Sequence, residues 1–74
     1  MNGMSKYFIE VTKPSGMKTH FGRDMEERYE PVSRLDGSVG FDHRIDAERE
    51  IPKVIEYCNS MGVIYSSIVV AKKE

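Results

Sequence analysis

Hydrophobic residues recur at three- and four-residue intervals along one stretch of the chain, from Asp46 to Gly62. This spacing gathers apolar side chains on one side of a 3.6-residue period, which is typical of a helix packed on a core. The residues on that side are Ala47, Ile51, Val54, Ile55, Cys58 and Met61. The pattern therefore predicts one α-helix, with Asp46 as its N-cap and Gly62 as the residue that ends it.

Pro52 lies inside this predicted helix. Proline cannot donate to the carbonyl four residues earlier, and this costs about 3 kcal/mol in a helix interior. Two interpretations follow: one helix that passes through Pro52, or a separate turn over residues 46–50 before a shorter helix that begins at Pro52. We favour one helix, because the apolar side continues through Pro52 without a break.

The N-terminal part of the chain predicts a β-hairpin. Tyr7 to Lys13 is rich in aromatic and β-branched residues, and its alternation gives a first strand. Pro14-Ser15-Gly16 predicts a tight turn into a second strand from Met17 to Phe21. One face of the first strand carries Tyr7, Ile9 and Val11, and the other carries Phe8, Glu10 and Thr12.

Three further segments complete the pattern. Arg23 to Glu30 is charged and predicts a loop or one irregular turn anchored by Met25 and Tyr29, with a twisted extension of the second strand as the alternative. Asp36-Gly37-Ser38 lies between two short apolar runs, 32–35 and 39–41, and predicts a second, short hairpin. Val63 to Ala71 is the most continuously apolar stretch and predicts an interior strand of the sheet.

The order β-β-β(-β)-α-β predicts a small α+β domain. We expect a two-layer sandwich in which one helix packs on one face of a mostly antiparallel sheet of about three to five strands. The expected single domain covers residues 1–74, with flexible ends at 1–5 and 72–74. The helix is expected to cover Tyr7, Ile9, Val11, Ile64, Ile68 and Val70. One helix covers one face only, so the opposite face is expected to leave an exposed patch containing Phe8, Thr12, Tyr65 and Val69.

Composition narrows the class of protein. A chain of 74 residues is near the size at which one core supplies only about 3 to 5 kcal/mol, so a partner or self-association would add stability. Charged residues make up 31% and balance to a net charge of −1, which gives no overall basic field for nucleic acid or anionic membranes. No apolar run approaches the ~20 residues needed to span a bilayer, and the N-terminus lacks a signal-peptide pattern. We expect a cytoplasmic protein without membrane contact.

The side chains that carry chemistry are few. His20, His43 and Cys58 are the only nitrogen or sulfur candidates for metal ligation, and none has a paired ligand spacing, so we expect neither a metal nor a cofactor. Cys58 lies on the apolar side of the helix, which predicts a core residue and not a nucleophile. The enzymatic alternative is a small nuclease in which His20 and His43 form an acid–base pair assisted by Arg44 or Tyr29. We expect no enzyme, because a domain of this size rarely offers the concave pocket that catalysis needs.

An RNA- or DNA-binding module is a further alternative. Lys18, His20 and Arg23 supply positive charge, and Phe8 and Tyr65 supply aromatic rings on which bases stack. Acidic residues are mixed among these basic ones, however, and the predicted order lacks the β-α-β-β-α-β arrangement of an RNA-recognition domain. We therefore expect no nucleic-acid partner.

A short domain of hairpins plus one helix, without a catalytic signature, resembles small accessory proteins of phages and mobile elements that bind a host protein. Anti-CRISPR proteins and host-polymerase inhibitors include chains of this size, and the resemblance is one of size and architecture. It implies a non-enzymatic protein-binding module that inhibits or modulates another protein, and a homodimer is one form of such binding. The expected contact surface is either the uncovered sheet face, with Phe8, Tyr65 and Val69, or an edge strand together with Arg23, Glu26, Glu27, Arg28 and Tyr29.

Overall fold

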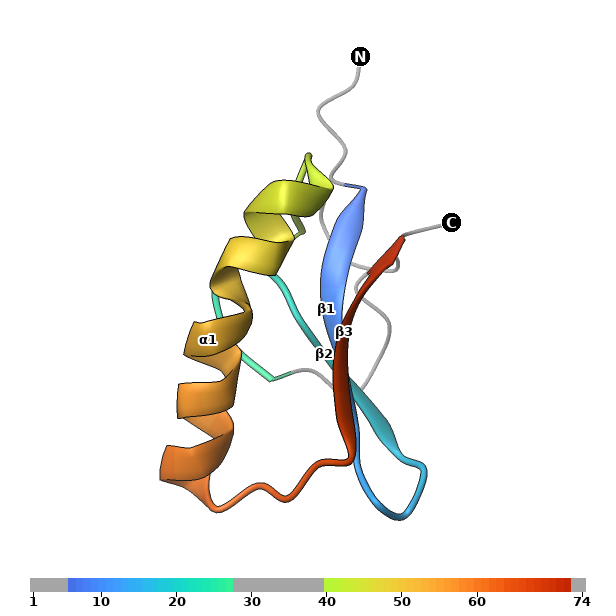
Figure 1. Ribbon diagram of the computed structural model, residues 1–74, viewed down its shortest axis with the longest axis vertical. Helices are drawn as coiled ribbons and strands as arrows, with labels where there is room; N and C mark the ends of the chain where they lie inside the picture. Colours follow the sequence, from blue (N-terminus) through green and yellow to red (C-terminus); the bar gives the residue numbers. More distant parts are fainter. Residues whose placement is uncertain (1–5, 28–39, 73–74) are drawn as a thin grey trace.

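The computed structural model describes residues 6–27 and 40–72. The elements follow in the order β1 (Tyr7–Thr12), β2 (Lys18–Phe21), α1 (Arg44–Met61) and β3 (Ser67–Lys72). Figure 1 shows α1 lying along one side of the three strands. This two-layer α+β arrangement is the one that the sequence predicts.

The sheet has the strand order β2-β1-β3, and both pairs are antiparallel. β1 is the central strand, so Glu10 lies opposite His20 of β2 and opposite Val69 of β3. The expectation of an interior strand over residues 63–71 is wrong. That strand begins only at Ser67, and it lies at an edge of the described sheet because β1, paired on both sides, occupies the interior.

The predicted hairpin between β1 and β2 is confirmed. The Lys13 N–H donates to the Met17 carbonyl at 2.8 Å, and the Gly16 N–H donates to the Lys13 carbonyl at 2.8 Å. Gly16 has φ 93°, in the left-handed region that favours glycine. A short loop that starts with proline and ends with a left-handed glycine is a common hairpin connection.

α1 passes through Pro52 as one helix, as the unbroken apolar side predicts. Its beginning differs from the prediction. The helix starts at Arg44 with His43 in the N-cap position and no side-chain cap hydrogen bond, so the assignment of Asp46 as N-cap is wrong. Asp46 lies instead within the first turn, where its carboxylate still interacts favourably with the helix dipole.

The end of α1 is a Schellman motif. Gly62 has φ 71°, its N–H donates to the Asn59 carbonyl, and the Val63 N–H donates to the Cys58 carbonyl at 2.8 Å. These two bonds satisfy carbonyls that the helix end would otherwise leave without a donor. The predicted role of Gly62 is therefore confirmed.

The core lies between α1 and the sheet. It consists of Ile9, Val11, Phe21, Phe41, Ala47, Val54 and Cys58. The rings of Phe21 and Tyr57 meet edge to face with centroids 5.2 Å apart, which adds to the burial energy. Two residues expected in this layer are exposed: Ile64 by 74% and Met61 by 63%. Met61 is the last residue of α1, and Ile64 lies in the connection to β3, where strand alternation does not apply.

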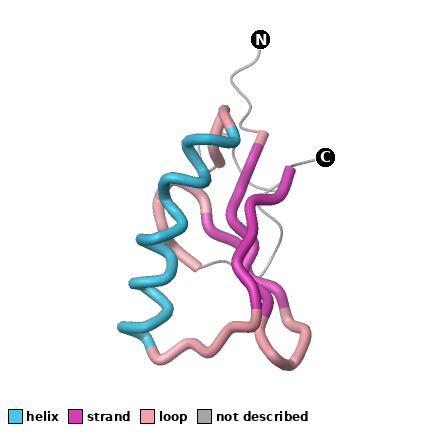
Figure 2. The backbone as a smooth tube through the Cα atoms, viewed as in Figure 1, coloured by secondary structure: helices cyan, strands magenta, loops and turns pink. Residues whose placement is uncertain are grey.

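The connection from α1 to β3 is fixed to β1 at its end. The Ser66 N–H and the Ser66 hydroxyl both donate to the Thr12 carbonyl, at 2.8 and 3.1 Å. Figure 2 shows this connection running from the end of the helix to the first residues of β3. The contact determines where β3 begins.

A short antiparallel bridge joins Phe41 to Tyr7, through N–H···O=C bonds of 2.8 and 2.9 Å in both directions. The bridge ties the segment before α1 to the start of β1. The predicted second hairpin lies outside the described residues, apart from its last residues at Gly40 and Phe41. Lys72, expected in a flexible end, is the last residue of β3.

Candidate functional site

The sheet face opposite α1 does not present the patch that the sequence predicts. Phe8 is only 7% exposed, and its ring meets that of His20 edge to face with centroids 4.9 Å apart. Tyr65 is half-buried and packs against the core on the helix side, because it precedes β3 and does not follow the alternation of that strand. Val69 is 48% exposed and remains accessible on this face. The expected exposure of Phe8 and the expected position of Tyr65 are therefore wrong.

A carboxylate occupies the middle of this sheet face. Glu10 Oε2 lies 3.5 Å from Lys18 Nζ, and Glu10 Oε1 lies 3.9 Å from His20 Nε2. Two of the basic residues expected to contact nucleic acid, Lys18 and His20, thus lie beside an acidic group. Because Phe8 is buried as well, the arrangement expected for base stacking is not present.

The two histidines of the nuclease alternative lie on different sides of the sheet. His20 is buried on the face opposite the helix, whereas His43 is exposed and immediately precedes α1, which packs on the other face. The structure does not bring these side chains together as an acid–base pair.

The charged segment after β2 is only partly exposed. Arg23, Asp24 and Glu26 are exposed, as expected for a solvated segment. Glu27 is not: its side chain is 10% exposed, and its carboxylate lies 3.3 Å from Lys13 Nζ. Met25 adopts φ 57° and packs against the core, which anchors the segment as predicted.

Arg28 and Tyr29, the other expected contact residues in this segment, lie outside the described residues.

Cys58 is buried in the core, as predicted. Burial raises the pKa of its thiol, the nearby Glu27 carboxylate raises the pKa further, and Lys13 opposes this effect. A neutral thiol of this kind is a poor nucleophile.

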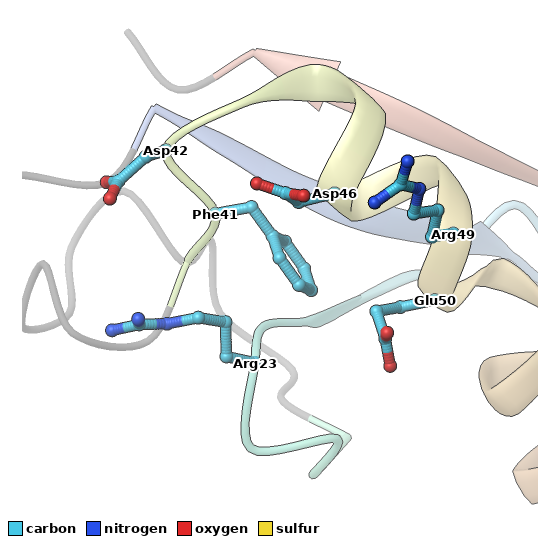
Figure 3. A pocket seen from close by; sticks show the side chains of 6 residues that line it. All are labelled: Arg23, Phe41, Asp42, Asp46, Arg49 and Glu50. Carbon is cyan, nitrogen blue, oxygen red and sulfur yellow. The ribbon is translucent and has the colours of Figure 1, made fainter.

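A hollow of about 420 Å³ lies at the start of α1, as Figure 3 shows. Phe41 lies between the helix and the segment that carries Arg23. The lining residues are Arg23, Phe41, Asp42, Asp46, Arg49 and Glu50. Three separate segments supply this mixture of acidic and basic side chains, and of the predicted site residues only Arg23 is among them. Glu50 is already paired with Lys53 at 3.2 Å.

Residues 6–27 and 40–72 contain neither a cluster of metal-ligating side chains nor a membrane-spanning helix. No group of three or more His, Cys, Asp or Glu side chains in these ranges could hold a metal ion. No helix in the same part of the chain is long and apolar enough to cross a bilayer. Comparisons with protein-family models, with curated proteins and with solved structures give no match.

The outer edge of β3 differs from the other surfaces. β3 contains the apolar run Ile68 to Ala71 and neither charge nor proline before Lys72, yet none of its six residues is buried. β1 and β2, in contrast, each contain three buried residues. Natural edge strands are commonly protected by charges, prolines or bulges. In the described part of the sheet, no strand pairs with β3 on its outer side.

The hydrogen-bond pattern shows which backbone groups point to that outer side. Partners that exchange N–H···O=C bonds alternate along an antiparallel pair. The Lys13 N–H donates towards β2, so odd-numbered residues of β1 face β2 and even-numbered residues face β3. The even-numbered residues of β1 lie opposite Ser67, Val69 and Ala71 of β3. The N–H and C=O groups of Ile68 and Val70 therefore point away from β1, to the outer side of β3.

Proposed function

We propose that this chain is a non-enzymatic protein-binding module that takes up an extended segment of another protein along the outer edge of β3. One observation carries the proposal: the most apolar of the three described strands is an edge strand without a buried residue. Strand addition uses main-chain hydrogen bonds for affinity and alternate side chains for specificity. The outward N–H and C=O groups of Ile68 and Val70 would supply the main-chain hydrogen bonds. Val69 would supply an exposed side chain for specificity.

The position of the partially buried side chains supports the same edge. Ile68 and Val70 pack against the core on the helix side, yet both remain partly exposed. An added strand would cover them and extend the apolar layer beneath α1. The resemblance in size and architecture to host-directed accessory proteins leads us to propose a host protein as the source of the segment.

The test compares two substitutions at one position. Val70→Pro removes the outward N–H, which is not part of the ladder to β1, whereas Val70→Ala removes a similar amount of side chain and keeps that N–H. Peptides selected from a displayed library of random ten-residue sequences for binding to the wild type should bind Val70→Ala and lose at least about tenfold in affinity for Val70→Pro.

Amide hydrogen exchange gives a second measurement. The peptide should slow exchange at Ile68 and Val70, and leave exchange at Ser67 and Val69 nearly unchanged because those N–H groups already bond to β1. Selection that yields no binding peptide, or peptides that bind both Val70 variants equally, would contradict strand addition at this edge.

A further inference from the structure

We infer that, when no segment of another protein is bound, β3 of a second copy of this chain pairs with the same edge, antiparallel about a twofold axis that passes beside Val69. The inference rests on the proposed function, because a second copy and a segment of another protein would use the same edge of β3 and compete for it. The self-pairing yields a continuous sheet of order β2-β1-β3-β3-β1-β2 with both helices on one face.

The absence of charged side chains along most of β3 favours pairing with a second copy. Ser67 to Ala71 carries no charged side chain, so antiparallel self-pairing brings no like charges opposite each other along these residues. The net charge of −1 adds little repulsion between two copies.

Geometry then restricts the register. Residues directly opposite in an antiparallel pair point to the same face, so an odd-numbered residue of β3 must face an odd-numbered one. The outward groups of Ile68 and Val70 must in turn bond to outward groups of the second copy. The register that pairs Ile68 with Val70 in both directions meets both conditions and keeps the apolar run centred. It places Val69 opposite Val69 and Ser67 opposite Ala71.

The two faces of this join have different roles. On the helix side, each Ile68 meets a Val70, and both are already half-buried against the core. α1 contacts β3 as well as β1, so the helix of each copy lies near the join. On the other face, the two half-exposed Val69 side chains cover each other. A domain of this size gains from the added apolar burial.

Cysteine pairs test the register. In this arrangement Val69 and its counterpart form a pair without mutual hydrogen bonds, with Cα atoms about 4.5 Å apart, within the range that a disulfide spans. Ser67 lies on the same face and is also exposed, but the two Ser67 residues are separated by about 13 Å along the strands. Val69→Cys should form a disulfide-linked dimer under mild oxidation, whereas Ser67→Cys and the wild type, whose Cys58 is buried, should not. Equal cross-linking of both variants, or none of Val69→Cys, would overturn the register.

Charge substitution at the axis tests the dimer itself. Val69→Lys and Val69→Glu should each be monomeric by sedimentation, because each places like charges directly opposite. An equimolar mixture should form dimers, since Lys then faces Glu. Only pairing between two β3 strands predicts this rescue.

The mass of the wild-type protein in solution distinguishes the two proposals without any substitution. A dimer that dissociates on dilution supports self-pairing. A wild type that is monomeric up to about 1 mM overturns it. If such a monomer still binds selected peptides through the Val70 N–H, strand addition stands and only self-pairing is wrong.

Discussion

Cys58 lies where three segments meet. It is a buried residue of α1. Glu27, which follows β2, and Lys13, which follows β1, both affect the pKa of its thiol. The pair formed by Lys13 and Glu27 is mostly shielded from water, at a distance of 3.3 Å. The pKa of the thiol is therefore sensitive to how the helix packs against the segments that carry Lys13 and Glu27.

This burial makes stability depend on pH in a defined direction. The folded state holds the thiol proton to higher pH than the unfolded state does, because burial raises the pKa. The contribution of Cys58 is thus fully present below the unfolded pKa of about 8.5 and is lost as pH rises through the folded pKa. Urea unfolding of the wild type and Cys58→Ala between about pH 7 and pH 10 should show an additional alkaline loss in the wild type. A difference between the two proteins that stays constant with pH would contradict this expectation.

Single residues show what a periodic pattern can predict. Alternation correctly assigns Ile9 and Val11 to the face that α1 covers. It also assigns Phe8 correctly to the opposite face, but not its burial, because alternation carries no information about which groups pack on a face. For Tyr65 even the predicted face is wrong, because β3 begins two residues after it, at Ser67.

At the scale of elements, α1 retains a proline in its interior. Pro52 offers no N–H to the Glu48 carbonyl, four residues before it. Pro52→Ala restores this bond and removes the ring, so we expect a gain in the free energy of unfolding of up to about 3 kcal/mol. Urea denaturation measures it. Lys53→Ala, at the next and exposed position, is the control and should change stability by less than about 1 kcal/mol. Unchanged or lower stability in Pro52→Ala would show that the helix is adapted to the proline.

The C-terminal cap of α1 gives a second prediction. A Cβ added at Gly62 would meet no atom within 4 Å, so the cost of Gly62→Ala comes only from φ 71°. We expect a loss of about 1 kcal/mol, and a smaller loss for Gly62→Asn, because asparagine adopts left-handed φ more readily. Thermal unfolding of the three proteins checks the order, and a larger loss for Asn than for Ala would contradict it.

Elements differ in how far sequence predicts them. The helix and the first hairpin follow from local signals: an apolar period, Gly62, and Pro14 to Gly16. The start and position of β3 do not. They depend on Ser66 bonding to Thr12 and on β1 pairing with both other strands, and these contacts join residues far apart in the chain.

At the scale of the whole molecule, the candidate surfaces form only when segments far apart in the sequence come together in the fold. The hollow beside α1 combines residues that follow β2, precede the helix and lie within it, so no local motif predicts it. The outer edge of β3 likewise follows from strand order. The sequence correctly indicates an unusually apolar strand, and the fold places that strand at an edge of the described sheet.

The pairing of the first strand with the last one has a consequence for synthesis. β1 leaves the ribosome early, but its second neighbour, residues 67–72, follows only after the whole helix. Until then β1 has one strand partner instead of two, and the nascent chain exposes an apolar edge that resembles the outer edge of β3. Contacts over such sequence separations also slow folding. We therefore expect this domain to complete its fold only after residues 67–72 have left the ribosome, when pairing of β1 with its own β3 competes with pairing of β1 with a neighbouring chain.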